Sequence, residues 1–163
     1  MAGALDIAAR YARRWQIEEV FRSMKRKGFD IEALAIRDEA PRNRLILACF
    51  IAACVVMQMT AERDGPRDGL SLRPLTDAFD PGDRTLLEAL SHDLRGRTMR
   101  QKTPHPEGSL AFASRVCARL GGWTGYYGKP GPIVILRGWI EFQTLKHGVS
   151  LAQRMTQGSA KDA

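Results

Sequence analysis

The chain of 163 residues is long enough for one ordinary domain, or for one domain and part of another. Its hydrophobic fraction of 44% and charged fraction of 26% are typical of globular proteins and exclude a disordered or collagen-like chain. An excess of 25 Lys and Arg over 18 Asp and Glu gives a net charge of +7, which favours a polyanionic partner such as nucleic acid without proving one.

The first predicted helix covers residues 4–27, a stretch without Gly or Pro and rich in Ala, Arg and Glu, which are good helix formers. Three basic residues and then a glycine end it, as suits a helix C-terminus. Residues 29–36 are predicted to be either a strand or an irregular segment. The second predicted helix covers residues 43–62, with Pro41 before it and Asn43 as its cap.

An apolar run occupies residues 45–59 of the second predicted helix. It is shorter than the ~18 residues that a membrane-spanning helix needs, so we expect a buried core helix and no membrane span. Cys49 and Cys54 in this run are expected to be packing residues. Together with Cys117 they form no CxxC pair and no closed disulfide framework, and the histidines show no metal-ligand spacing. These features predict a reduced, cytoplasmic protein without a signal peptide or a zinc site.

The rest of the chain is also predicted to be helical. Residues 63–75 are rich in Gly and Pro and are the best linker candidate. Further helices are predicted over residues 80–94, 109–120 and 133–157. No internal repeat and no convincing alternating strand pattern is present, so the predicted fold class is mainly α.

Two loops between the later helices carry side chains that nucleic-acid-binding proteins use. Residues 95–102 are basic, which is typical either of a backbone contact or, more often, of a solvated loop. Trp123, Tyr126 and Tyr127 lie in a Gly-rich loop, where they stack on a base or cover an edge of the core. Both interpretations stay open for each loop.

One face of the first predicted helix gathers long polar side chains. At 100° per residue, five of them fall on an arc about 80° wide. They are Tyr11, Arg14, Glu18, Arg22 and Lys25. One interpretation is a solvated face with Arg14–Glu18 and Glu18–Arg22 ion pairs. The other is a carboxylate flanked by cations that bind phosphates. Ile17, Val20, Phe21 and Met24 lie on the remaining side of this helix and are predicted to face the core.

The stretch Tyr-Ala-Arg-Arg-Trp-Gln-Ile-Glu-Glu-Val-Phe-Arg-Ser-Met-Lys resembles the signature helix of the insertion-sequence-four family of bacterial transposases. That signature is Tyr, two residues, Arg, three residues, Glu, six residues and Lys. Tyr11, Arg14, Glu18 and Lys25 keep every spacing. Later landmarks fall in the order of the C-terminal part of the transposon-five-like DDE transposases of that family. They are Arg119-Leu-Gly-Gly-Trp123, Gly138-Trp139 and Gln157-Gly158. The resemblance is tight over this helix and loose across residues 63–110.

The resemblance implies a catalytic site. Members of the family cut and paste DNA with an RNase H-like domain, in which two Asp and one Glu hold Mg²⁺ or Mn²⁺ ions. Glu18 would be the catalytic, metal-binding Glu. Tyr11, Arg14 and Lys25, with Arg22 on the same face, would bind the phosphates of the transposon-end DNA.

The resemblance also implies that part of this site is missing. In the family both Asp residues lie far upstream of the Glu helix, whereas Tyr11 lies close to the start of this chain. Asp6 is on the same predicted helix, and Asp30 and Asp38 follow it, so none of these can take their place. We therefore expect this polypeptide alone to bind no metal and to be catalytically inactive.

By the same resemblance, residues 1–63 would be the C-terminal tail of an RNase H-like α/β domain, and residues 64–163 a helical dimerisation domain. The last predicted helix is apolar on more than one side. Its apolar residues are Leu136, Trp139, Ile140, Phe142, Leu145 and Val149. An ordinary helix buries one stripe, so the surplus stripe either packs inside a bundle or pairs with a second copy.

Three functions stay open. The chain belongs to an active DNA-cutting enzyme, located in the cytoplasm at the nucleoid. Alternatively, it is a non-catalytic interaction protein that forms dimers with full-length transposase and inhibits it. Thirdly, it is a remnant that folds poorly, because the apolar side of the first helix would be exposed without a covering sheet.

Overall fold

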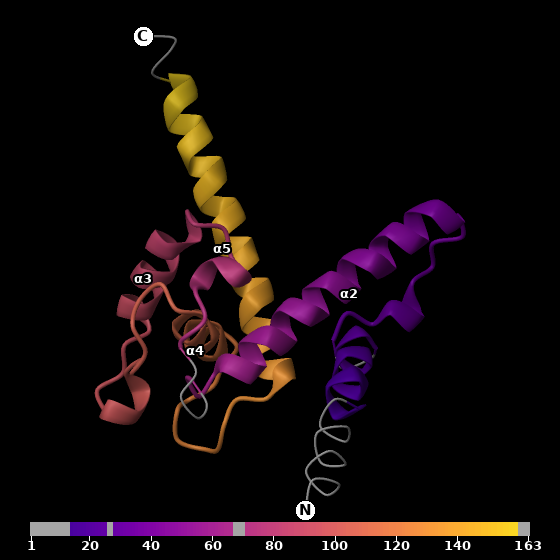
Figure 1. Cartoon of the computed structure of the whole chain (residues 1–163). Coiled ribbons are helices and arrows are strands. Elements are labelled where there is room, and N and C mark those ends of the chain that lie inside the picture. Colours follow the sequence, from indigo (N-terminus) through magenta and orange to yellow (C-terminus); the bar gives the residue numbers. More distant parts are fainter. Residues whose placement is uncertain (1–13, 26–27, 67–70, 160–163) are drawn as a thin grey trace, which may run out of the picture.

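The computed structural model of the chain describes residues 14–25, 28–66 and 71–159 (Figure 1). Within these ranges the chain is helical and forms no β-strand. A first helix covers residues 14–24. It is followed by η1 (Ile31–Ala33), α2 (Glu39–Glu62), η2 (Leu75–Asp77), α3 (Asp83–Asp93), η3 (Met99–Gln101), α4 (Leu110–Leu120) and α5 (Pro132–Ser159). The prediction of a mainly α fold is confirmed for the part of the chain that the structure describes.

Local capping explains why α4 agrees with its predicted bounds. The Ser109 side chain accepts a hydrogen bond from the backbone N–H of Phe112 at 3.1 Å, which satisfies one of the free donors of the first turn. Gly121 follows the last residue of α4, and its N–H donates to the carbonyl of Cys117 at 2.9 Å. A cap residue at one end and a glycine at the other therefore define this helix.

The structure decides one open prediction and corrects another. Residues 29–36 were predicted to be a strand or an irregular segment, and they form η1 and irregular backbone. α2 begins at Glu39, before Pro41, and not at Asn43. Proline is compatible with the first turn of a helix because the N–H groups there have no partner within the helix. The proline was therefore a sign of an early first turn and not of a boundary.

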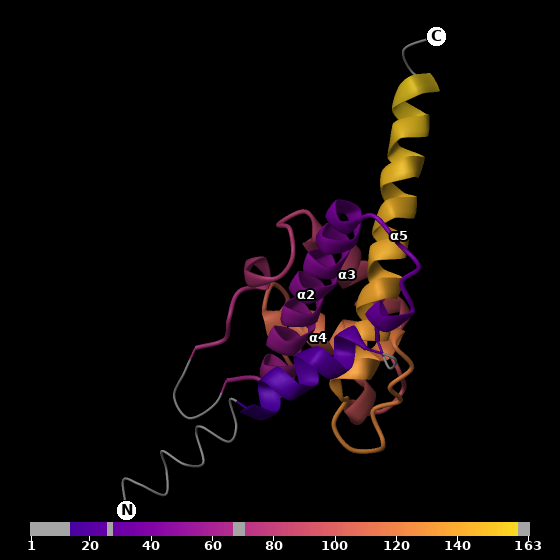
Figure 2. The same ribbon diagram turned by 90° about the vertical axis from the view of Figure 1, so that its right-hand side faces the viewer.

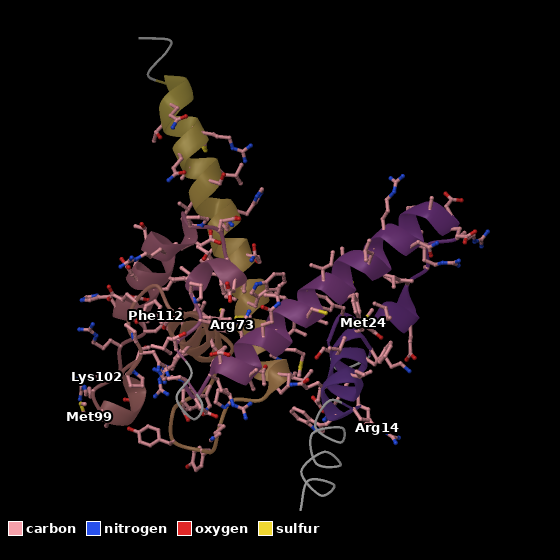
Figure 3. All side chains as sticks on the ribbon, viewed as in Figure 1. Arg14, Met24, Arg73, Met99, Lys102 and Phe112 are labelled. Atoms are coloured by element: carbon pink, nitrogen blue, oxygen red, sulfur yellow. The ribbon has the colours of Figure 1, made fainter. Side chains whose placement is uncertain are left out.

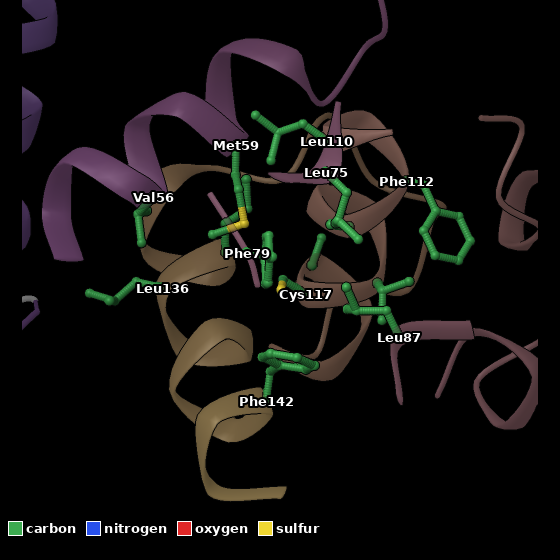
Figure 4. Packing of buried hydrophobic residues seen from close by; sticks show 14 residues of the cluster. Val56, Met59, Leu75, Phe79, Leu87, Leu110, Phe112, Cys117, Leu136 and Phe142 are labelled. Atoms are coloured by element: carbon green, nitrogen blue, oxygen red, sulfur yellow. The ribbon is translucent and has the colours of Figure 1, made fainter. Parts of the chain in front are cut away.

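The main core lies where α2, α4 and α5 meet and is closed by η2 and α3 (Figure 4). Phe142 of α5 is fully buried and meets Phe79 edge to face, with ring centroids 5.4 Å apart. Val56 and Met59 bring the second half of α2 into the same core. The domain boundary predicted after residue 63 therefore lies directly behind α2, a helix that shares its core with the later elements. The boundary itself stays a prediction.

α4 and α5 cross with their backbones in close contact. A Cβ atom added to Gly138 of α5 would overlap the carbonyl oxygen of Cys117 in α4, and one added to Gly121 would overlap the carbonyl oxygen of Val134. Only glycine allows two helices to approach this closely. The hydroxyl of Ser114 in α4 donates to the carbonyl of Met59 in α2 at 2.8 Å and so ties the third helix to this crossing.

The first helix packs on α2 through a smaller core. Met24 is 3% exposed and lies against Cys49 and Ala53 of α2. The apolar side predicted to face the core is only half covered, because Ile17 and Phe21 are 57% and 50% exposed. The first helix touches α2 with one side, so the other half of its apolar stripe has no partner among the described residues.

α2 is buried unevenly. Its C-terminal part lies in the main core, as predicted, but Leu47, Phe50 and Ile51, before and at its middle, are exposed. Among the described residues, α2 is the one helix long and apolar enough to cross a membrane by length and composition, with 33% of its apolar window buried. A core helix of a globular protein passes the same test, so this property alone does not indicate a membrane span.

The last part of α5 extends away from the body of the molecule (Figures 1 and 2). Residues 147–157 are exposed, including three large apolar side chains. These are Val149 and Leu151, each 43% exposed, and Met155, 75% exposed. α5 is therefore a core helix at its start and a solvent-exposed amphipathic helix at its end.

Candidate nucleic-acid interface

The polar face of the first helix lies on the surface. Arg14, Glu18, Arg22 and Lys25 are all exposed, and Arg14 is placed on the first helix in Figure 3. Tyr11 lies outside the described residues. The structure thus brings four of the five predicted site residues to one helix and its C-terminal turn, with their side chains open to a ligand from solvent.

Each cation of this face is paired with a different carboxylate. Arg14 donates through Nε to Oε1 of Glu18 at 3.0 Å. Arg22 bonds Glu19 at 3.0 Å, not Glu18 as the wheel suggested, because i,i+3 and i,i+4 partners are both within reach on a helix. Lys25 pairs with Glu32 of η1 at 3.1 Å. Glu19 and Glu32 are therefore part of the electrostatics of this face, although the sequence pattern did not single them out.

Two of these ion pairs, Arg14–Glu18 and Lys25–Glu32, are weak enough to be exchanged, whereas the Glu19 side chain that pairs with Arg22 is only 11% exposed. The side chains of Arg14 and Glu18 are 77% and 61% exposed, and those of Lys25 and Glu32 are 55% and 49% exposed. Exposed pairs contribute ~0–1 kcal/mol because water screens them. A guanidinium group binds phosphate as it binds carboxylate, often through two parallel hydrogen bonds, so a phosphate group can compete with such a carboxylate. The face is thus neutralised in the free chain and available to a polyanion.

The turn after the first helix fixes the position of Lys25. The N–H groups of Gly28 and Asp30 donate to the Lys25 carbonyl at 2.9 and 3.1 Å, and that of Phe29 donates to the Ser23 carbonyl at 2.8 Å. A Cβ atom at Gly28 would overlap the Ser23 carbonyl, so this turn requires glycine. The same turn leads the chain to η1, where Glu32 meets Lys25.

Glu18 does not form a metal site with the other described residues. They contain no group of three or more His, Cys, Asp or Glu side chains placed to hold a metal ion. Mg²⁺ requires an octahedral set of oxygen ligands, and a two-metal site needs several carboxylates. Glu18 offers one carboxylate, which is bonded to Arg14. The residues present in the described ranges therefore do not fit a divalent metal pair.

An open apolar groove of about 700 Å³ lies between the first helix and α2. Its lining is mostly apolar, with Ile17 and Phe21 on one side and Phe50, Cys54 and Met57 on the other. Arg73 stands at its edge, bonded to Gln58 and Asp77 at 2.7 Å each. The groove contains the exposed half of the apolar stripe.

Comparison with known protein families supports the resemblance. Residues 3–55 match the family model described as "Transposase DDE domain". The match covers about a third of the chain and includes the whole signature from Tyr11 to Lys25. No curated protein matches the chain. This part of the chain is therefore similar to the DDE domain of transposases, a class of enzymes that acts on DNA with divalent metal ions.

Proposed function

We propose that this chain is the C-terminal part of a cut-and-paste DNA transposase of the insertion-sequence-four family. In this proposal the first helix binds transposon-end DNA, and Glu18 is one of three metal-binding carboxylates. The observation that carries the proposal is the coincidence of two features on one helix. The signature lies inside the segment similar to the DDE domain, and three of its four residues are exposed together with Arg22.

The roles proposed for the individual residues follow from their chemistry. Arg14 would exchange Glu18 for phosphate oxygens, and Lys25 would exchange Glu32. Arg22 would keep its bond to the buried Glu19 and offer its remaining N–H donors to a phosphate. Once Arg14 turns to the DNA, the carboxylate of Glu18 becomes available as a metal ligand. Tyr11 would donate its hydroxyl to a neighbouring phosphate. A Mg²⁺ or Mn²⁺ ion held by Glu18 would need further carboxylates from outside the described residues, because Glu18 supplies only one.

We further propose that residues 1–63 are the tail of an RNase H-like domain, and that the chain alone does not cut DNA. Glu18 has no carboxylate partners for a metal pair among the described residues. A protein that binds DNA without cutting it would act in the cytoplasm, at the nucleoid.

The experiment that tests the DNA-binding face compares charge-removing variants on duplex DNA. R14A, R22A and K25A should each weaken the binding of a duplex taken from the DNA flanking the gene by about fivefold. Each should also reduce the slope of log affinity against log salt by about 1. Fluorescence anisotropy at several salt concentrations measures both quantities. R154A removes the same charge from the exposed end of α5 and should bind as the wild type does; equal losses in all four variants would refute the face.

One observation favours the second candidate function, an interaction protein that pairs with full-length transposase and inhibits it. The end of α5 carries Val149, Leu151 and Met155 exposed to solvent, and residues of this kind commonly mark helix pairing. A dimeric mass at tens of micromolar would support pairing through this helix, and a strictly monomeric mass would contradict it. Adding the chain to a full-length relative separates the two functions, because an unchanged transposition rate would exclude the inhibitor.

A further inference from the structure

The loop that follows α3 and the loop that joins α4 to α5 meet at the end of the body opposite the free end of α5 (Figures 1 and 2). We call them the basic loop, residues 95–102, and the aromatic loop, residues 123–130. The hydroxyl groups of Thr98 and Tyr126 lie 3.3 Å apart and connect the two loops directly. Segments that the sequence separates thus form one continuous surface.

Arg119 of α4 holds both loops in place. One guanidinium nitrogen donates to the carbonyls of Trp123 and Thr124 at 3.1 and 2.9 Å, and the other donates to the carbonyl of Leu94 at 3.1 Å. These bonds engage the guanidinium group with neutral carbonyls, so its positive charge adds to the local potential. The Arg115 guanidinium stacks over the Trp123 ring at 4.8 Å. Burial and the charge of Arg119 both lower the pKa of Arg115, which agrees with a positive field at this junction.

The basic loop presents its cations from an ordered segment. Thr98 and Gln101 form a capping box around η3, with the Thr98 N–H donating to Gln101 Oε1 at 3.4 Å. Arg95, Arg97 and Lys102 are exposed, and the loop contains no acidic residue. A polar pocket of about 270 Å³ opens beside Arg95 and Lys102, with Glu107 as the one carboxylate in its lining.

The aromatic loop exposes rings that proteins usually cover. Tyr127 is 86% exposed and Tyr126 is 46% exposed, while Met99 of the basic loop is 79% exposed. The Trp123 indole donates to the Gly128 carbonyl at 3.2 Å and keeps the loop folded back on itself. The aromatic loop also contains no acidic residue. Exposed rings next to exposed cations are the combination that binds unpaired nucleotides, since rings stack on bases and cations hold phosphates.

This surface is separate from the first helix. Figure 3 shows Met99 and Lys102 on one side of the molecule and Arg14 on the other. The two sets of cations therefore do not form one binding face, and a duplex lying on the first helix would leave the two loops available for another strand.

We propose that the basic and aromatic loops form a second nucleic-acid site, which binds an unpaired DNA strand with phosphates on Arg95, Arg97 and Lys102 and a base stacked on Tyr127. The proposal rests on the proposed function in one respect, namely that the polyanionic partner of the chain is DNA. It adds a second class of ligand, single-stranded DNA, and a second place on the molecule.

The test measures the affinity of the full chain for two fluorescent probes, an oligothymidine single strand and a duplex of mixed sequence. The triple variant R95A/R97A/K102A should bind the single strand about 100-fold more weakly, with a salt slope reduced by about 2. Y127A should lose about tenfold on the single strand and little on the duplex, because only an unpaired base can stack on the ring. Y127F keeps the ring and should bind as the wild type does.

Two outcomes would overturn the proposal. One is that the triple variant binds oligothymidine with the same affinity as the wild type. The other is that Y127A loses the same affinity for the single strand and for the duplex. The altered side chains are exposed, so the circular dichroism spectrum and the unfolding midpoint should not change. R14A tests the proposed function separately, since it should weaken duplex binding alone. If R14A has no effect while the loop variants behave as expected, the first-helix face fails and the two-loop site remains.

Discussion

Replacing Gly138 by alanine should destabilise the folded chain by about 3 kcal/mol, an overpacking cost at the upper end of the usual range. The new methyl group would overlap the Cys117 carbonyl oxygen, which belongs to the backbone of α4 and cannot rotate away. The strain is relieved only if α4 and α5 move apart, and that movement opens the core around Phe142 and Met59. Urea unfolding followed by circular dichroism measures the change.

Gly148 is a matched control for this substitution. It lies in the same helix, and a Cβ atom there would meet nothing within 4 Å. Alanine has the higher helix propensity, so G148A should stabilise the chain by ~0.5–1 kcal/mol. If α4 and α5 did not cross closely at Gly121 and Gly138, G138A should stabilise the chain by the same small amount as G148A. A stabilising G138A would therefore contradict the packing described for these helices.

Replacing Lys146 by methionine should also cost about 3 kcal/mol, because it leaves a buried carboxylate without its cation. Lys146 of α5 bonds Asp83 at 2.8 Å and Asp80 at 2.6 Å, at the start of α3. Asp83 is 4% exposed. Burial alone would lower the pKa of Lys146, but its bonds to the two carboxylates outweigh this and raise that pKa. The cation is therefore kept at neutral pH and joins α5 to α3.

The pH dependence of unfolding follows from the same cluster. The hydrogen bond from Lys146, and then its charge, lower the pKa of Asp80. A carboxyl group whose pKa is lowered by folding stabilises the folded chain above its ordinary pKa, and this stabilisation is lost as the pH falls. The raised pKa of Lys146 has the opposite sign, so its stabilisation is lost as the pH rises through the alkaline range. Urea unfolding curves recorded across the pH range measure both effects. In K146M, the free energy of unfolding should show neither the acidic loss nor the alkaline loss that comes from this cluster.

R84M is the control for K146M. Arg84 forms an i,i+4 pair with Glu88 on the surface of α3, with side chains 57% and 32% exposed. Loss of such a pair should cost less than ~0.5 kcal/mol. The double variant D83N/K146M should recover part of the loss, because the buried charge is then removed along with its partner. If K146M and R84M had the same effect, the ion pair would not stabilise the fold.

Features set by neighbouring residues could be predicted from the sequence. Ser109 and Gly121 marked the ends of α4, because a cap and a terminating glycine act within one turn. The start of α2 was placed too late, because a proline in the first turn and one before the helix look the same in the sequence. The apolar side of the first helix was recognised, but periodicity does not tell which element covers it, and Ile17 and Phe21 are left exposed.

For the candidate site too, the local helical arrangement could be predicted from the sequence, but the contacts between side chains could not. Helical spacing placed Arg14, Glu18 and Arg22 on one face. The partner of Arg22 was not predictable, because Glu18 and Glu19 lie at similar distances from it on the helix. The pairing of Lys25 with Glu32 depends on the turn between them. The meeting of the basic and aromatic loops was also not visible in the sequence, because it depends on long-range contacts, namely the bond from Arg119 to the Leu94 carbonyl and the contact between the Thr98 and Tyr126 hydroxyl groups.

We propose that the first helix binds DNA while this chain alone does not cut it. One measurement tests both parts. The purified chain and its R14A/R22A/K25A variant are incubated with an end-labelled duplex from the DNA flanking the gene, with Mg²⁺ or Mn²⁺. Free, bound and cut DNA are then resolved on native and denaturing gels. We expect a shifted, uncut duplex with the wild type and an unshifted duplex with the variant. Metal-dependent cleavage that E18Q abolishes, or an equal shift with the variant, would contradict the proposal.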